Sequence, residues 1–259
     1  MLTQNQIKHI QSLQQKKIRS IHKQFIAEGP KLVEELIGSK FSFEKIYAKK
    51  EWLTDHIDSV QKNEIPFIEI NDKELERISA LTTPNNVLAV LNIPEQTIPV
   101  DIFGKELILV LDEIKDPGNL GAIIRTANWF AINHIICSEN SVDIYNPKVV
   151  QATMGSIAKV NVYYANLRKL LEENAEKAAI YGAFTDGESI YDIKPAEHGI
   201  IVIGNESAGI SNDLQEFIQK RISIPLHRNE NERNPESLNA SIAAAIICYE
   251  FRRKSQVHS

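Results

Sequence analysis

Short, continuously apolar runs recur along the chain, and segments with a helical spacing of apolar residues lie between them. The clearest runs are Leu107–Leu111 and the stretch 199–203. Uninterrupted apolar runs of this kind are expected of strands that are covered on both faces. Their regular alternation with helices predicts an α/β fold, in which a mostly parallel sheet carries helices on both faces.

The same alternation divides the chain into two predicted domains. Residues 1–95 combine a polar helix, expected over 3–23, with short strands and further helices, which predicts a small α/β domain. The segment around 92–104 holds two prolines and little periodicity, and we interpret 96–105 as a linker. Residues 106–259 are then the second, larger domain.

Composition is that of a globular protein, with 43% hydrophobic and 24% charged residues. The N-terminus shows no apolar leader, and no apolar run approaches the ~20 residues of a membrane span. Cys137 and Cys248 both fall in apolar segments, which favours buried, reduced thiols and a cytoplasmic location. The histidines are scattered and no CxxC or HxxxH pattern occurs, so we expect no metal site.

The net charge of −5 does not indicate a nucleic-acid-binding protein, but the charges are unevenly distributed. Five cationic residues precede the first acidic residue, Glu28; they are Lys8, Lys16, Lys17, Arg19 and Lys23. On charge alone, a basic arm that contacts RNA and a merely solvated helix face are equally open interpretations.

Three turn-and-helix segments contain the candidate chemistry. In the first, 116–125, a strand gives way to a helix that Asn119 is expected to cap. Arg125 follows two isoleucines in this helix, so its guanidinium must pair, stack or reach a pocket. Taken alone, the pattern favours a structural ion pair for Arg125.

The other two segments lie in the last third of the chain. The stretch 203–211 places Glu206 between two glycines that allow tight turns and close approach of a ligand. The stretch 237–246 begins a helix rich in small residues. Taken alone, the former is equally an ordinary turn, and the latter favours a capped core helix.

Together and in order, the three segments resemble the motifs of the SpoU/TrmH family of RNA ribose 2′-O-methyltransferases, within the SPOUT superfamily. The matching positions are Asn119 and Arg125 in the first motif, Gly204, Glu206 and Gly209 in the second, and Pro225, Ser237, Asn239 and Ser241 in the third. Residues 13–37 and 81–91 resemble the family's N-terminal substrate-binding domain, and 151–156 fits its pattern between motifs. The resemblance therefore spans nearly the whole chain.

The resemblance implies a trefoil-knotted catalytic domain that binds S-adenosylmethionine, needs no metal and works as a homodimer. It implies catalytic roles for Arg125, Asn119, Glu206, Ser237 and Asn239. It implies cofactor binding by Phe184, Gly204, Ile224, Leu226, Ser237, Leu238 and Asn239. With the charge pattern, it suggests RNA binding by Lys16, Lys17, Arg19, Lys23, Arg125, Arg228 and Arg233.

Two of these expectations need a physical comment. Arg125 is implied to activate the 2′-hydroxyl, but a guanidinium has a pKa above ~12, so we interpret its role as a bidentate phosphate clamp that positions the hydroxyl. Residues 226–236 depart from the family pattern, because this link is longer than usual and lacks glycine. Arg228 and Arg233 make it either an RNA-contacting flap or a solvated loop, with equal weight.

The predicted function is methyl transfer from S-adenosylmethionine to a ribose 2′-hydroxyl of structured RNA. Ribosomal RNA is the favoured substrate, because the N-terminal domain resembles that of rRNA-modifying members, and tRNA is the alternative. A non-catalytic RNA-binding protein that kept the fold is a rival, which the intact Asn119, Arg125, Glu206 and Asn239 argue against. A nucleotide-binding α/β enzyme is disfavoured, because the GxGxxG and GK[ST] patterns are absent.

Overall fold

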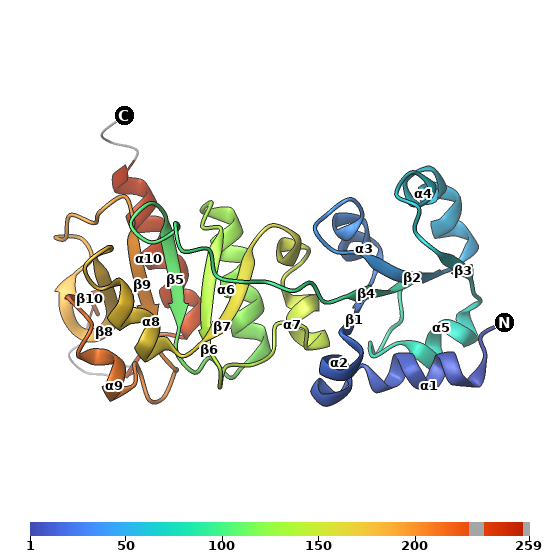
Figure 1. Cartoon of the computed structure of the whole chain (residues 1–259), viewed down its shortest axis with the longest axis horizontal. Helices are drawn as coiled ribbons and strands as arrows, with labels where there is room; N and C mark the ends of the chain where they lie inside the picture. Colours follow the sequence, from blue (N-terminus) through green and yellow to red (C-terminus); the bar gives the residue numbers. More distant parts are fainter. Residues whose placement is uncertain (228–235, 256–259) are drawn as a thin grey trace. The chain divides into compact units, whose positions relative to one another are not determined.

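The computed structural model describes residues 1–227 and 236–255, the last two of them by their backbone alone (Figure 1). The chain folds into two compact units, Met1–Gln96 with Asp143–Lys159, and Thr97–Val142 with Val160–Ser259. Each unit has its own β-sheet and its own apolar core. No helix of the described residues is long and apolar enough to cross a membrane.

The first unit is built on a four-stranded sheet in the order β1-β4-β2-β3. Its strands are β1 (Gln24–Glu28), β2 (Phe43–Ala48), β3 (Phe67–Glu69) and β4 (Val87–Asn92). β4 is antiparallel to both neighbours, whereas β2 and β3 are parallel. The helices from this part of the chain are α1 (Gln4–Ser12), α2 (Lys16–His22), α3 (Pro30–Leu36), α4 (Lys50–Lys62) and α5 (Asp72–Ile78).

Two helices, α1 and α2, replace the single helix expected over 3–23. Arg19 stabilises the break, because its Nη1 donates hydrogen bonds to the carbonyl oxygens of Leu13 and Gln14 at 2.9 and 2.8 Å. Carbonyl groups at a helix end lack intrahelical partners, and here a side chain from the next helix supplies one. The apolar stripe therefore continues across a break that its spacing does not reveal.

The second unit contains a six-stranded sheet in the order β10-β8-β9-β5-β6-β7, in which every pair is parallel. Its strands are β5 (Leu107–Leu111), β6 (His134–Ser138), β7 (Asn161–Ala165), β8 (Ile180–Ser189), β9 (Gly199–Ile203) and β10 (Lys220–Ser223). Its helices are α6 (Pro117–Trp129), α8 (Leu167–Asn174), α9 (Asn212–Gln215) and α10 (Ala240–Ser255).

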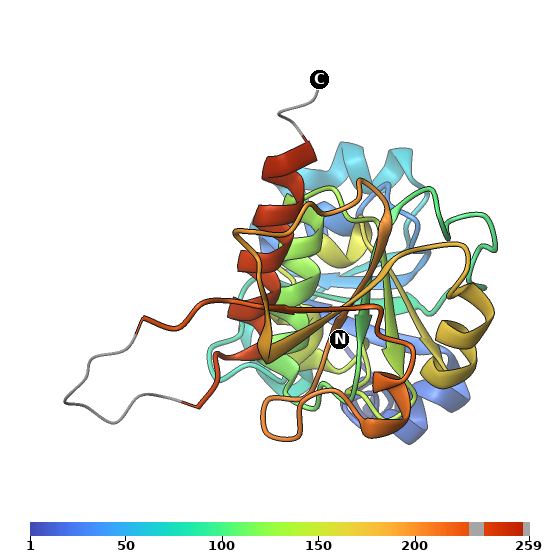
Figure 2. The ribbon, with the colours of Figure 1, turned by 90° about the vertical axis from the view of Figure 1, so that its left-hand side faces the viewer.

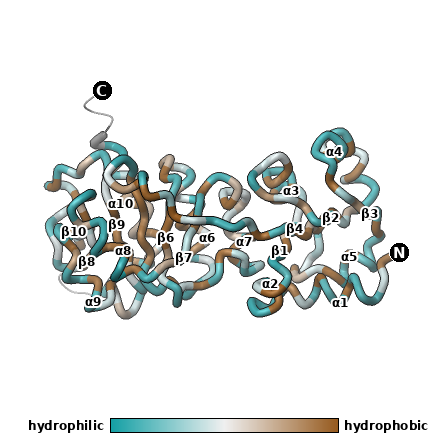
Figure 3. The backbone as a smooth tube through the Cα atoms, viewed as in Figure 1, coloured by the Kyte–Doolittle hydropathy of each residue, from teal (hydrophilic) through white to brown (hydrophobic). Residues whose placement is uncertain are grey.

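Helices cover both faces of this sheet. Figure 2 shows α6 and α10 on one side of the strands and α8 on the other. All residues of β5 and β9 are buried, and the hydropathy colouring of Figure 3 is strongly apolar in the centre of the unit. The predicted α/β class with a mostly parallel, doubly covered sheet is therefore confirmed.

The segment between β6 and β7 belongs by its contacts to the first unit. It contains α7 (Pro147–Ala152) and the 3₁₀ turn η1 (Ser156–Ala158), and α7 packs on β1. Tyr145, just before α7, lies with its ring 4.8 Å from the ring of Phe25 on β1. The sequence predicts a single domain over 106–259, whereas residues 143–159 group by their contacts with the first unit.

Candidate functional site

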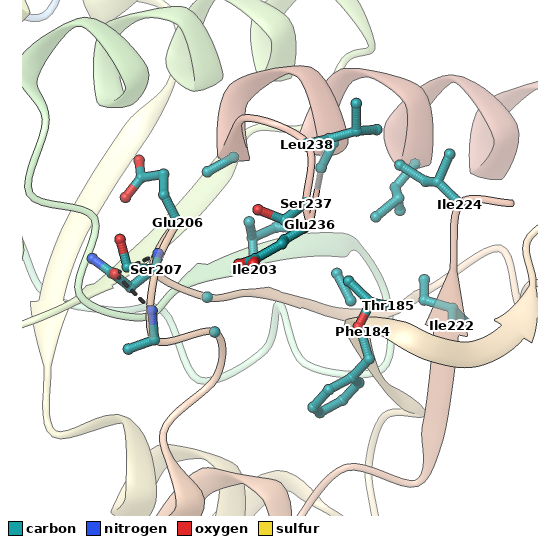
Figure 4. A pocket seen from close by; sticks show the side chains of 18 residues that line it. Phe184, Thr185, Ile203, Glu206, Ser207, Ile222, Ile224, Glu236, Ser237 and Leu238 are labelled. Carbon is teal, nitrogen blue, oxygen red and sulfur yellow. Dashed lines mark hydrogen bonds between the residues drawn. The ribbon is translucent and has the colours of Figure 1, made fainter. Parts of the chain in front are cut away.

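A cavity of about 630 Å³ lies in the second unit, where β8, β9 and β10 meet the start of α10 (Figure 4). Ligands of open parallel sheets commonly bind beyond the carboxyl ends of the strands, as here beyond β9. The lining residues are Ala183, Phe184, Thr185, Ile203, Gly204, Asn205, Glu206, Ser207, Ala208, Gly209, Ile222, Ile224, Glu236, Ser237, Leu238, Ala240, Ala243 and Ile247.

The turn that follows β9 forms one wall of this cavity, and its backbone is tightly fixed. A Cβ atom on Gly204 would lie 2.2 Å from the carbonyl carbon of Gly209, so only glycine fits at position 204. Gly209 itself has φ +68°, a conformation that glycine adopts without strain. Asn205 and Gly209 exchange two backbone hydrogen bonds of 3.0 and 2.9 Å across the turn.

The side chain of Asn205 holds the same turn from inside. Its Oδ1 accepts hydrogen bonds from the backbone N–H groups of Ser207 and Ala208 at 2.9 and 3.1 Å. Its Nδ2 donates to the carbonyl oxygen of Glu113, just after β5, at 3.0 Å. Asn205 therefore joins the turn after β9 to the loop that leads into α6.

Three side chains from the three candidate motifs form a hydrogen-bonded row. Asn239 Nδ2 donates to Asn119 Oδ1 at 2.9 Å, and Asn119 Nδ2 donates to Glu206 Oε1 at 2.5 Å. We refer to Asn239, Asn119 and Glu206 as the amide–carboxylate row. Each amide is oriented by its neighbours, so the row fixes the relative positions of α6, α10 and the turn after β9.

The helix starts explain why these side chains are free to meet. Asp116, not Asn119, caps α6, and its Oδ1 accepts from the backbone N–H of Asn119 at 2.8 Å. Pro117 suits the first helical position, so the helix begins earlier than expected and the side chain of Asn119 is released for the row. At α10, Asn239 Oδ1 accepts from the backbone N–H of Ser241 at 2.9 Å while its Nδ2 serves the row.

The expected cofactor residues divide into two groups. Phe184, Gly204, Ile224, Ser237 and Leu238 line the cavity. Leu226 and Asn239 do not appear among the described residues that line it; Leu226 is largely exposed, and Asn239 contacts Asn119 instead. Among the expected catalytic residues, Glu206 and Ser237 also line the cavity.

Phe184 lines the cavity, but its aromatic ring points away from it. Figure 4 shows its ring turned away from Ser237 and Leu238, and the ring packs against the core of the unit. The guanidinium carbon of Arg221 lies 3.5 Å from the centre of the ring, and Asp186 holds Arg221 through a 2.6 Å contact. This hydrogen bond from Arg221 lowers the pKa of Asp186 below its usual value.

Arg125 lies exposed on α6, and no ion-pair partner is found for it among the residues that the structure describes. The structural ion pair favoured by the isolated pattern is therefore not observed in this part of the chain. Arg228 and Arg233 lie outside the described residues. In the described ranges, no group of three or more His, Cys, Asp or Glu side chains could hold a metal ion.

The basic residues of the N-terminal arm are not equivalent. Lys16, Lys17 and Lys23 are exposed. Arg19 is 2% exposed, and its Nη2 and Nε contact Asp143 Oδ2 at 2.6 and 3.0 Å. The expectation that Arg19 contacts RNA is corrected, because its guanidinium is buried and occupied by Asp143 and by carbonyl groups of the α1–α2 turn.

Sequence reasoning missed Asn205 and Glu236 as part of the site. Each is the immediate neighbour of a residue that the motifs did identify, Glu206 and Ser237 respectively. Adjacent residues of a tight turn lie close to the same small volume, so their position next to Glu206 and Ser237 could have indicated that they belong to the site.

Comparison with known proteins agrees with this geometry. Residues 106–249 match the model of the SpoU rRNA Methylase family, and residues 4–89 match the MRM3-like substrate binding domain. The chain is 29% identical over 248 residues to the 23S rRNA (guanosine(2553)-2′-O)-methyltransferase RlmP of Bacillus subtilis, covering 95% of each protein.

Solved structures agree as well. A TrmH-family protein of Porphyromonas gingivalis superposes with a TM-score of 0.87 at 36% identity, covering 98% of this chain and 99% of that one. An AdoMet-bound rRNA methyltransferase of Sinorhizobium meliloti gives a TM-score of 0.84 at 26% identity, covering 98% and 96%. The chain belongs to the SpoU rRNA methylase family.

Proposed function

We propose that this chain methylates a ribose 2′-hydroxyl of ribosomal RNA, with S-adenosylmethionine as the methyl donor. The observation that carries the proposal is the amide–carboxylate row, which joins all three family motifs beside one cavity. Ribosomal RNA is favoured over tRNA because the B. subtilis relative, matched along almost its whole length, is a 23S rRNA enzyme.

The residues present fit the proposed cofactor. A cavity of about 630 Å³ lies within the range of sites for small organic ligands, roughly 300–1,000 Å³. Its wall combines aliphatic side chains such as Ile203, Ile222 and Ile224, suited to a flat base, with the closely packed backbone at Gly204. When bound, the cofactor supplies a methyl group made electrophilic by a sulfonium.

The chain's own residues position the reactants around this methyl group. The cofactor would be held by Phe184, Gly204, Ile224, Ser237 and Leu238. The amide–carboxylate row keeps the turn after β9 and the start of α10 at a fixed distance from each other. Alignment of two bound reactants lowers the barrier of such a transfer substantially. We propose that Arg125, which is exposed on α6, holds a nucleotide phosphate with its planar fork and so orients the 2′-hydroxyl.

The family membership also supports a homodimer. Trp129 on α6 and Ile242 and Tyr249 on α10 are 84, 51 and 54% exposed, and α6 packs directly on α10. A second copy of the chain would bury this apolar surface in a two-fold contact. Light scattering should report a dimer, and Trp129→Glu should shift the population towards monomer; a monomeric wild-type protein at high concentration would contradict the dimer.

Further expectations rest on the same membership. We infer a trefoil knot in the C-terminal part of the second unit and a cytoplasmic site of action. The segment 1–95 is proposed to bind the RNA substrate and 106–259 to carry the cofactor, joined by 96–105. Lys16, Lys17 and Lys23 support this division, because they are exposed on the first unit.

The decisive experiment is to map ribose methylation across total RNA with and without the gene. Loss of methylation at one rRNA position is the expected result. Loss at a tRNA position would move the substrate to the alternative class, and no change anywhere would count against methyl transfer. Calorimetry with S-adenosylmethionine distinguishes the rival: a protein that binds RNA but not the cofactor would be a non-catalytic relative.

A further inference from the structure

The charged side chains in the part of the cavity wall that the structure describes are all negative. Among the eighteen described residues that line it, Glu206 and Glu236 are the charged ones, and none is Lys, Arg or His. Glu206 is engaged by Asn119 at 2.5 Å. For Glu236, the described residues provide no ion-pair partner. Figure 4 shows Glu236 beside Ser237 in the segment that precedes α10.

This negative charge matters because S-adenosylmethionine and its demethylated product, S-adenosylhomocysteine, differ mainly in the charge on sulfur. Methyl transfer breaks a C–S bond and forms an O–C bond; the sulfur keeps the electron pair of the broken bond, and the hydroxyl proton is released to solvent water. The sulfonium cation thereby becomes a neutral thioether. A sulfonium offers no N–H or O–H group, so a protein can distinguish it from the thioether by charge but not by a conventional hydrogen bond.

We propose that Glu236 is the residue that makes this site prefer the cationic methyl donor over its neutral product. The proposal rests on the proposed function of the cavity. The carboxylate of Glu236 attracts a cation in the cavity and gains nothing from the thioether. Glu206 also carries a negative charge, but the hydrogen bond from Asn119 fixes its Oε1 towards α6, whereas no such bond fixes Glu236 among the described residues. The preference would also favour release of the product once the methyl group has been transferred.

A purely structural role for Glu236 makes a different prediction. An acidic side chain just before a helix stabilises the positive end of the helix dipole. In that case, removing the charge would lower thermal stability and weaken both ligands equally. Discrimination between donor and product would not change.

The test is calorimetric titration of the full chain with S-adenosylmethionine and with S-adenosylhomocysteine. Glu236→Gln is expected to weaken donor binding by about two- to fivefold, the range of a partly exposed ion pair, and to leave product binding unchanged. Glu236→Asp keeps the charge and should keep the preference. The matched control is Glu197→Gln, an exposed acid of the same unit that does not line the cavity, which should alter neither affinity.

Salt gives an independent readout. Raising the ionic strength should reduce the donor's advantage more in the wild-type protein than in Glu236→Gln, because screening acts on the charge attraction that the variant has partly lost. Equal weakening of both ligands, or an unchanged ratio of the two affinities, would overturn the proposal while leaving the methyltransferase function intact. A wild-type protein that binds neither ligand would overturn both.

Discussion

Asn119 donates a hydrogen bond of 2.5 Å to Glu206, although 87 residues separate them in the chain. Asn239 donates in turn to Asn119, across 120 residues. The row brings together the start of α6, the turn after β9 and the start of α10. Its consequences can be tested by changing one member at a time.

Replacing Asn119 by Ala removes the donor to the Glu206 carboxylate. A hydrogen bond to a charged group contributes about 1.5–3 kcal/mol, so we expect a ~10- to 150-fold slower single-turnover methylation. Asn119→Asp should be slower still, because it sets a second carboxylate against Glu206. Asn133→Ala, an exposed asparagine before β6 at the other end of the strands, is the control and should be near normal. Equal rates for Asn119→Ala and wild type would contradict the proposed role of the row.

Lysine should not replace Arg125 without a loss of turnover. Lysine retains the charge but not the planar fork, so Arg125→Lys is expected to lose about tenfold or more in turnover while its affinity for S-adenosylmethionine stays unchanged. Arg168→Lys is a matched change, since Arg168 forms an exposed ion pair with Glu216 at 2.6 Å and should have little effect. Near-normal turnover of Arg125→Lys would exclude bidentate clamping.

The exposed lysines of the N-terminal arm should govern affinity for RNA. Changing Lys16, Lys17 and Lys23 to Gln is expected to weaken RNA binding and to reduce the slope of log affinity against log salt by about 2–3, if each contacts one phosphate. Cofactor affinity should not change. The triple control Lys50→Gln, Lys62→Gln and Lys73→Gln removes three other exposed charges of the first unit. A parallel fall in cofactor affinity would instead indicate a structural role for the arm.

Arg19 should behave as a structural residue. Removing one partner of a buried ion pair leaves the other charge uncompensated and lowers the free energy of unfolding by about 3–5 kcal/mol. Arg19→Met should therefore lower the urea midpoint markedly. Asp143→Asn should do the same, because Asp143 accepts both bonds from the guanidinium. Lys105→Met, which removes a mostly exposed pair with Asp101 at 3.7 Å, should cost little. If the urea midpoint of Arg19→Met were as high as that of Lys105→Met, the buried pair would not stabilise the packing of α7 in the first unit.

Glu28 should make the first unit more stable in mild acid. Its carboxyl accepts hydrogen bonds from Ser79 and Ala80, yet burial outweighs them and raises its pKa above the ordinary 4.5. The folded state then binds the proton more tightly than the unfolded state, so this contribution is complete below pH 4.5 and is lost as pH rises through the raised value. Urea unfolding between about pH 4 and 7 should show this slope in the wild type and lose it in Glu28→Gln; identical profiles would argue against it.

The sequence by itself determined the parallel sheet and the motifs. Leu107–Leu111 and the apolar run of β9 are buried throughout, because an uninterrupted apolar run requires cover on both faces of a strand. No single segment was sufficient to select Asn119, Glu206 and Asn239, but the three segments read together and in order were, because they resemble a family pattern. The sequence thus specified which residues matter and which elements present them.

Only the tertiary structure decided what those residues touch. Arg19 and Lys17 are indistinguishable as charges in a basic arm, but the former is buried against Asp143, 124 residues away, and the latter is exposed. Asn119 looked like a helix cap and is instead a bridge to Glu206. Partners so distant in sequence leave no periodic signal, because their contact arises from how strands and helices pack and not from the spacing within any one of them.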